Sequence, residues 1–179
     1  MKKNLDNIIV TVVNGEQEFL EHIPHRNFLN LSMVYRSVSE SEDGFCSIML
    51  SKSAIDSLEI SEDELFNIAV ENIERDFTPM LEMIDTNFYV LSNEYKVFGA
   101  VNMIISDKIK ELAERIDRNL FILPSSVHEV FILPDYNQDI EFLKSVVMDA
   151  NRTVVKGKDI LSDNVYYYNR TTKSIDVMI

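Results

Sequence analysis

The residues whose types and spacing could support catalysis are concentrated in one stretch, residues 123–134, with the sequence LPSSVHEVFILP. It places Ser125, Ser126, His128 and Glu129 within five positions. In a serine hydrolase, the hydroxyl loses its proton to a histidine nitrogen about 3 Å away, and a carboxylate orients the imidazole. These four residues are therefore the candidates for a catalytic site.

Strand geometry separates the four candidates. On an extended strand, Ser126 and His128 share one face, whereas Ser125 and Glu129 point to the other. Glu129 is then poorly placed to orient His128, and the stretch has no G-x-S-x-G elbow that would project a serine. A turn through residues 124–126 that hydrogen-bonds its own backbone before a core strand is the favoured interpretation. A hydrolytic site stays the alternative.

The three histidines, His22, His25 and His128, raise the question of a metal site. Two histidines in an H-x-x-H pattern can bind a metal from one helix face, but Pro24 between His22 and His25 favours a turn. A zinc ion would need one or two further ligands, for which the sequence offers Glu21, Cys46 and Glu129. Because their spacing selects none of them, we predict no metal site. We expect His25 and Arg26 to lie in a loop that leads into the strand at 31–38.

A second group of residues is a candidate for binding a protein or a small ligand. Tyr166, Tyr167 and Tyr168 alternate along a strand, so Tyr166 and Tyr168 share a face. Tyrosine is favoured at protein interfaces, although core packing with the hydroxyls at the rim is the simpler interpretation. The binding candidates are His25, Arg26, Tyr166, Tyr168 and Arg170.

The composition limits the class of protein. The chain has 179 residues, a formal charge of −13 and 46% hydrophobic residues, which predicts a single domain over residues 1–179 with a substantial core. The negative charge repels phosphate backbones and anionic membrane surfaces, so we expect neither nucleic acid nor a membrane as partner. The sequence contains no glycine-rich phosphate loop or dinucleotide fingerprint, and we predict no cofactor.

The N-terminal residues and the single cysteine indicate the compartment. Residues 1–17 contain two lysines, but the apolar run is too short for a signal peptide or a membrane span. A single cysteine, Cys46, cannot form an intrachain disulfide. It lies in the apolar run FCSIML, which predicts a buried small side chain. We expect a cytoplasmic protein.

Hydrophobic periodicity predicts pairs of strands that alternate with single helices. The clearest helix covers residues 61–77, where Ser61 and Glu64 form a capping box. Ser106 is expected to cap a second helix over residues 107–117, and a third helix is expected over residues 139–151. Strands are expected at 7–15, 31–38, 45–50, 87–93, 97–105, 119–124, 127–134, 164–169 and 174–179.

This order predicts an α+β fold, a largely antiparallel sheet of paired strands with about three helices packed on one face. Gly99, inside the expected strand at 97–105, indicates a bulge or the close approach of another backbone. Four asparagines next to apolar segments are expected to be buried and to hold loops in place. They are Asn72, Asn93, Asn102 and Asn151.

Several fragments together resemble an uncharacterised bacterial domain-of-unknown-function family, common in anaerobic gut bacteria. The fragments are HIPHRNFLNLSMVY, YVLSN followed by FGA, ILPSSVHEVFILP, and DANRTVV leading into ILSDNVYYYNR. The similarity covers nearly the whole chain in the same order. Where the family carries a histidine and a tryptophan, this chain has LSKSAIDSL with neither, so any role of that histidine is in doubt here.

The resemblance implies no established activity. It implies that family members carry an additional N-terminal segment and that this chain corresponds to their C-terminal part. From the residues we expect a non-catalytic cytoplasmic domain that binds a protein or a small ligand. The alternative is a hydrolase or a metal-dependent enzyme centred on His128, with Ser125, Ser126 and Glu129.

Overall fold

The structure, a computed structural model, describes residues 5–42 and 44–178, apart from the side chain of Ser125. The parts of the sequence-based predictions that fall on residues 1–4, 43 and 179 lie outside the described residues. The chain divides into two compact units, with the boundary between Thr78 and Pro79. The α+β fold with antiparallel pairing is confirmed, in two sheets rather than one and with five α-helices rather than about three. The single domain expected over residues 1–179 stays a prediction.

The first unit contains a four-stranded antiparallel sheet centred on the long strand β3. The strands are β1 (Ile8–Asn14), β2 (His25–Phe28), β3 (Leu31–Ser41) and β4 (Gly44–Met49). β1 pairs along one edge of β3. β2 and β4 pair with successive segments of the other edge, so β3 is covered on both sides along most of its length.

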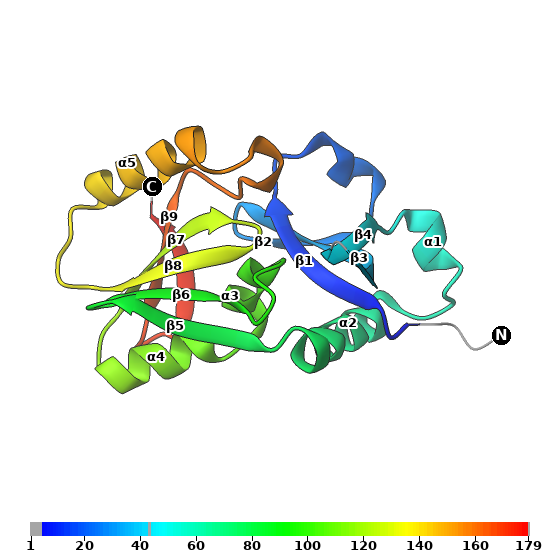
Figure 1. Ribbon diagram of the computed structural model, residues 1–179, viewed down its shortest axis with the longest axis horizontal. Coiled ribbons are helices and arrows are strands. Elements are labelled where there is room, and N and C mark those ends of the chain that lie inside the picture. The colour runs from blue at the N-terminus through cyan, green and yellow to red at the C-terminus, as the bar shows by residue number, and fades with distance from the viewer. Residues whose placement is uncertain (1–4, 43, 179) are drawn as a thin grey trace. The chain divides into compact units, whose positions relative to one another are not determined.

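One long helix packs on this sheet. The unit contains η1 (Glu18–His22), α1 (Lys52–Asp56) and α2 (Glu62–Asp76). Ser61 caps α2, since its Oγ accepts a hydrogen bond from the Glu64 N–H at 3.1 Å, which is the serine half of the predicted capping box. α2 packs against β1, as Figure 1 shows. Asn72 Nδ2 donates to the carbonyls of Leu5 and Ile8 at 2.8 and 2.7 Å, which confirms that this asparagine holds the chain in place.

Two predictions for the first unit were wrong. His25 and Arg26 lie in β2, not in a loop, because their short strand pairs with the start of β3. Cys46 is exposed, not buried. It belongs to β4, in which exposed and half-buried residues alternate, so an apolar run on this strand leaves every second side chain in solvent.

The second unit contains a six-stranded antiparallel sheet with the order β10-β9-β7-β8-β6-β5. The strands are β5 (Pro79–Asp85), β6 (Phe88–Asn93), β7 (Leu120–Ser126), β8 (Glu129–Pro134), β9 (Val165–Asn169) and β10 (Ser174–Met178). The helical segments are η2 (Gly99–Val101), α3 (Asn102–Ile105), α4 (Lys108–Ile116), α5 (Ile140–Thr153) and η3 (Gly157–Asp159).

Helices cover both faces of this sheet, so the prediction of helices on one face was wrong. Phe121 and Leu123 of β7 pack with Leu143 and Val147 of α5. The alternate residues of β7, such as Ile122, point to the opposite face and are also buried. Figure 1 shows α5 on one side of the sheet and α4 on the other. A strand with apolar side chains on both faces is stable only when other elements pack on each face of the sheet.

The strand predicted at residues 97–105 is wrong. This segment forms η2 and α3, and the strand that pairs with β6 on its outer side is β5. Phe98 has a left-handed backbone with φ 56°, which ends the extended chain, and a short apolar run does not distinguish a strand from a buried helix. The close approach expected at Gly99 is confirmed: an added Cβ would lie 2.7 Å from both the His128 carbonyl oxygen and the Ser92 Cα.

Ser106 lies one residue before the N-cap position of α4, so the predicted cap was wrong by one position. Asp107 occupies the N-cap position of α4 without a side-chain hydrogen bond. The Ser106 hydroxyl instead donates to the Asn102 carbonyl at 2.6 Å, at the end of α3. Its Oγ also accepts from the N–H of Lys108, the first residue of α4, at 3.5 Å, so this serine contacts both helices.

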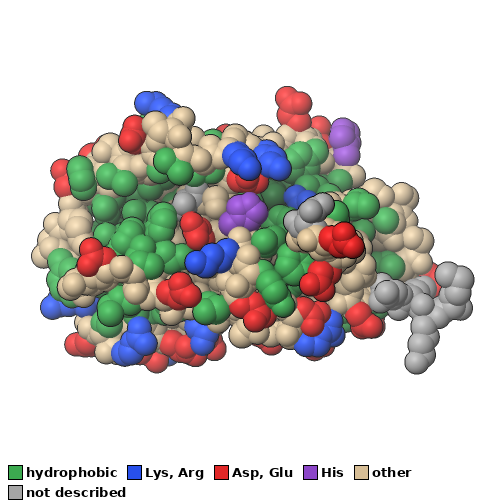
Figure 2. All heavy atoms as spheres, in the orientation of Figure 1, with side chains coloured by type: hydrophobic (Ala, Val, Ile, Leu, Met, Phe, Trp, Pro, Cys, Tyr) green, Lys and Arg blue, Asp and Glu red, His purple; other side chains and the backbone are tan. Residues whose placement is uncertain are grey.

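The surface carries mixed charge. On the face shown in Figure 2, acidic and basic side chains are interspersed with hydrophobic ones. In the part of the chain that the structure describes, none of the helices has the length and apolarity that crossing a membrane would require.

Candidate functional site

His128 lies in a two-residue turn, not on a strand. β7 runs through Pro124 to Ser126, and the chain turns at Val127 and His128 before β8. The turn predicted at residues 124–126 was therefore wrong by two positions. The pairing shifts between Leu123 and Ser126, an irregularity that allows the proline to stay within the strand.

The contacts of His128 tie this turn to its neighbours. His128 Nδ1 accepts a hydrogen bond from the Phe98 N–H at 3.2 Å, and the two rings lie 5.8 Å apart. The Ser92 hydroxyl donates to the His128 carbonyl at 2.8 Å. Ser126 Oγ accepts from the His128 N–H at 3.1 Å. These contacts connect the turn to β6 and to the segment before η2.

This geometry does not favour a proton relay. Because Nδ1 accepts from a backbone N–H, the neutral ring carries its proton on Nε2. Nε2 lies 3.8 Å from Asp159 Oδ1, so neither ring nitrogen is a free base directed at the Ser126 hydroxyl. Ser126 is buried. The side chain of Ser125 lies outside the described residues, and a catalytic role for Ser125, Ser126, His128 and Glu129 stays a prediction.

A groove of about 740 Å³ opens in the first unit, lined by η1, the start of β2, α1 and the segment that enters α2. Its apolar lining consists of Leu20, Ile23, Pro24, Ile55 and Ile60. Leu20 and Ile55 are buried and the other three are half-buried. The other six lining residues are polar or charged, so the groove offers a ligand both apolar and polar contacts.

The rim of the groove is acidic. It carries the carboxylates of Glu21, Asp56 and Glu62, against one ammonium group, that of Lys52. His25 also lines the groove. Its Nδ1 lies 3.0 Å from the Ile23 carbonyl oxygen, which can only accept a hydrogen bond, so Nδ1 carries the proton and Nε2 stays an acceptor in the neutral ring.

Arg26, next to the groove, holds one of these carboxylates in place. Its Nε donates to Glu62 Oε1 at 3.1 Å, its second amino group pairs with Asp63 at 2.5 Å, and its guanidinium lies 4.3 Å from the Phe66 ring centroid. The Tyr35 hydroxyl donates to the same Glu62 oxygen at 3.3 Å. Arg26 thus fixes the start of α2 against β2.

Burial and hydrogen bonding shift the pKa values of Tyr35 and Arg26. Burial raises the pKa of Tyr35 from its ordinary value to about 12, with Arg26 opposing the shift and Glu62 adding to it. The pKa of Arg26 is raised as well: burial acts to lower it, but the hydrogen bond to Asp63 and the field of Tyr35 outweigh burial. Glu62 therefore presents a positioned carboxylate at the rim.

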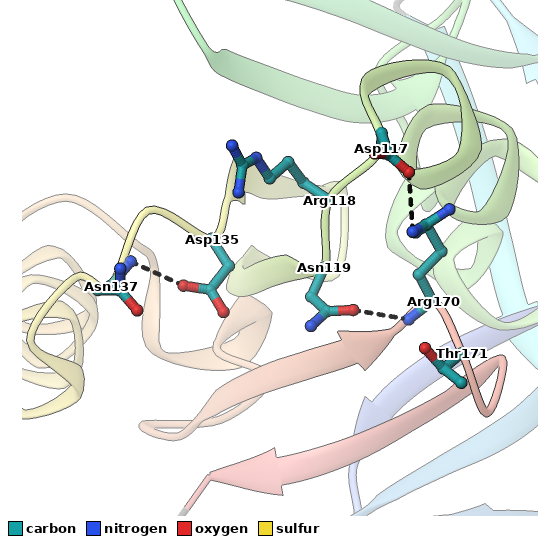
Figure 3. Close-up of a pocket in the computed structure, with 7 residues that line it drawn as sticks. All are labelled: Asp117, Arg118, Asn119, Asp135, Asn137, Arg170 and Thr171. Carbon is teal, nitrogen blue, oxygen red and sulfur yellow. Dashed lines mark hydrogen bonds and ion pairs between the residues drawn. The ribbon is translucent and has the colours of Figure 1, made fainter.

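A polar pocket of about 240 Å³ lies at one end of the sheet in the second unit (Figure 3). β7 begins at this end, and β8 and β9 finish there, because β7 is antiparallel to both. The lining residues follow or precede these strands and α4: Asp117, Arg118, Asn119, Asp135, Asn137, Arg170 and Thr171.

Asn119 connects two other parts of this pocket through its side-chain amide. Its Oδ1 accepts from the Arg170 N–H at 2.9 Å, and its Nδ2 donates to the Tyr167 hydroxyl at 2.8 Å. Tyr167 in turn donates to Asp135 Oδ2 at 2.6 Å. Burial first, and then the Asp135 hydrogen bond, raise the pKa of Tyr167. The Arg170 guanidinium is paired with Asp117 at 2.8 Å.

A family model described as "Family of unknown function (DUF5688)" matches residues 1–86 and 77–170. The chain belongs to this family. The matched ranges include the groove, the His128 turn and the polar pocket up to Arg170, so each lies in sequence characteristic of DUF5688. No curated protein and no solved structure matches the chain significantly.

The structure places the predicted binding residues in three environments. His25 lines the groove, Arg26 forms an ion pair with Glu62 of the groove, and Arg170 lines the polar pocket. Tyr166 and Tyr168 are buried in the core of the second unit, 0% and 5% exposed. Binding through either tyrosine stays a prediction.

The histidines lie in two different settings. His22 and His25 line the groove of the first unit, and His128 lies in its turn in the second. Within residues 5–42 and 44–178, no group of three or more histidine, cysteine, aspartate or glutamate side chains is placed to hold a metal ion.

The sequence did not predict most of the residues that line the groove or most of those that line the polar pocket. Ile55 and Asp56 belong to the short helix α1, whose only local signal is Ser51, an N-cap residue that accepts from the Ala54 N–H at 3.2 Å. Asn119 is the first residue of one predicted strand, and Asp135 directly follows another. Polar residues at the ends of antiparallel neighbours were the signal that could have brought them together.

Proposed function

We propose that this protein is a non-catalytic binding protein of the cytoplasm, and that the groove of the first unit holds a polypeptide segment in which a basic side chain lies next to aliphatic ones. The observation that carries the proposal is the composition of the groove. Five of its lining residues are apolar, and the charged ones are three carboxylates against one lysine.

The size of the groove supports a segment of a few residues. A volume of about 740 Å³ lies within the range of roughly 300–1,000 Å³ of ordinary ligand sites. Aliphatic side chains of the partner would cover Ile23, Pro24 and Ile60, which are half-buried in the free protein. The gain is roughly 25 cal/mol for each square ångström of apolar surface removed from water.

The rim supplies the preference for a basic partner. Arg26 and Tyr35 fix Glu62 before any ligand arrives, so this carboxylate loses little conformational freedom on binding, but its pairing with Arg26 offsets part of its charge. Glu21 and Asp56 are exposed and add negative potential, which speeds the approach of a cationic partner and disfavours an anionic one.

The proposal is tested by selecting binders from a random peptide library displayed on phage, with the full chain immobilised. We expect the selected peptides to contain arginine or lysine next to leucine, isoleucine or valine. Selection is repeated on the double variant Glu21→Lys/Asp56→Lys, which reverses two rim charges and should not recover these peptides.

A matched control changes the same net charge outside the groove. Glu71→Lys/Glu74→Lys alters two exposed residues of α2, more than about 13 Å along the helix from Glu62 at a rise of about 1.5 Å per residue. This control should recover the same peptides as the unaltered chain. Enrichment of acidic peptides, or of the same peptides on both double variants, would rule out the groove.

A further inference from the structure

We propose that the polar pocket of the second unit is a separate site for a small hydroxylated carboxylate, with Arg118 as the residue that binds the carboxylate group. The inference concerns a different unit and a different class of ligand from the groove, so each can fail without the other.

The guanidinium of Arg118 has no carboxylate partner among the described residues, and the proposal depends on this. Its guanidinium lies 5.3 Å from the Tyr136 ring centroid, which holds the planar group against an aromatic face. Among the residues that the structure describes, no carboxylate is paired with this guanidinium. Its donors therefore stay available at the mouth of a pocket in a protein whose formal charge is −13.

The second arginine of the pocket is not available in this way. Arg170 is paired with Asp117 at 2.8 Å, and its backbone N–H is bound by Asn119. Asp135 is likewise occupied, because Tyr167 donates to one of its oxygens and the Asn137 N–H to the other, at 2.8 Å. Figure 3 shows Arg118, Asp135 and Asn137 on one side, and Asp117, Arg170 and Thr171 on the other.

The rest of the lining defines the body of the ligand. All seven lining residues are polar or charged, and besides the ionised groups they supply the Thr171 hydroxyl and the amides of Asn119 and Asn137. Such groups donate hydrogen bonds to ligand hydroxyls and accept hydrogen bonds from them, but they offer no apolar surface on which an aliphatic chain could pack. A purely apolar carboxylate would therefore bind weakly, as would a neutral polyol.

The volume limits the length of the ligand. About 240 Å³ is the space of roughly eight water molecules at about 30 Å³ each. This volume suits a compact molecule with a short carbon chain. The carboxylate would form a two-pronged contact with the guanidinium, the geometry that arginine provides and lysine does not.

Three four-carbon probes separate the features of this ligand. L-Threonate has both the carboxylate and the hydroxyls, threitol has only the hydroxyls, and butyrate has only the carboxylate. Each is titrated into isotope-labelled protein while the Nε–Hε resonance of Arg118 is followed by NMR. We expect threonate to shift this resonance saturably, with an affinity at least about fivefold above that of either other probe.

Variants test the assignment to Arg118. Arg118→Gln should weaken threonate binding by about tenfold or more, and Arg118→Lys should restore only part of it. Arg115→Gln removes an equal charge from an exposed position of α4 outside the pocket and should leave the affinity unchanged. Backbone resonances of each variant report whether it is folded.

In folded protein, the proposal is overturned if threonate fails to bind saturably, or if butyrate or threitol binds as well as threonate. It is also overturned if Arg118→Gln binds threonate as well as the unaltered chain does. Equal losses in Arg118→Gln and Arg115→Gln would also overturn it, because they would indicate general attraction to positive charge.

Discussion

Replacing Gly99 by alanine tests the packing around the His128 turn. The added Cβ would lie 2.7 Å from the His128 carbonyl oxygen and 2.7 Å from the Ser92 Cα, and it would also meet the Ser92 hydroxyl. Ordinary contacts of a Cβ begin at 3.4 Å, so two backbone segments would have to move apart by about 0.7 Å.

The expected loss of stability follows from two opposing effects. Overpacking of this kind costs about 3 kcal/mol when the obstructing atoms are backbone. Alanine also restricts the unfolded chain more than glycine does, which returns roughly 0.4–1 kcal/mol. The net loss is about 2 kcal/mol, which lowers the Tm of a chain of 179 residues by about 4–8 °C.

The assay is thermal unfolding followed by circular dichroism, with Gly157→Ala as the matched control. No atom lies within 4 Å of a Cβ at Gly157, so this change should leave the Tm unchanged or slightly higher. If Gly99→Ala unfolds at the same temperature as Gly157→Ala, the close packing of the turn is refuted. The structural role assigned to His128 would then lose its support.

Three further changes test the first unit. Asn72→Ala removes a side-chain donor from the part-buried Leu5 carbonyl and the buried Ile8 carbonyl and should lower the free energy of unfolding by about 1–3 kcal/mol in urea titrations, whereas the exposed neighbour Glu71→Ala should change it by less than about 0.5 kcal/mol. Ser61→Ala removes the cap of α2 and should cost about 1 kcal/mol by the same measurement, and Ser61→Asp should recover most of it. Tyr35 keeps its proton to about pH 12 in the folded chain but loses it near pH 10 when unfolded. The free energy of folding that this proton contributes is therefore fully present below pH 10 and is lost as the pH rises from 10 to 12. Stability should fall by on the order of 2 kcal/mol over that interval, and this part of the fall should be absent in Tyr35→Phe.

The sequence was most informative where several local signals agreed. α2 was predicted because a capping serine, acidic residues at its start and an apolar stripe all indicated one helix. The strand at residues 97–105 failed because its composition alone was apolar, and nothing local revealed the left-handed Phe98 that turns the chain into η2. Helices on both faces of the second sheet were missed although β7 is apolar on both faces, a pattern that could have revealed them.

The candidate sites depended on long-range pairing that the sequence could not supply. The pocket brings together Asn119, Asp135 and Arg170, which come from three separate turns and meet only because β8 and β9 flank β7. Conversely, residues adjacent in sequence lost their apparent relationship. Ser126 and His128 are close, but the serine binds the backbone N–H of the histidine and not its ring.

The central claim is that the groove of the first unit binds a basic, aliphatic peptide, and isothermal titration of the best selected peptide tests it most directly. The Kd is measured for the unaltered chain, for Glu21→Lys/Asp56→Lys and for Glu71→Lys/Glu74→Lys. We predict a loss of at least about tenfold for the rim variant, a change within about twofold for the control, and weaker binding as salt is raised. Equal affinities for the two double variants would contradict the claim.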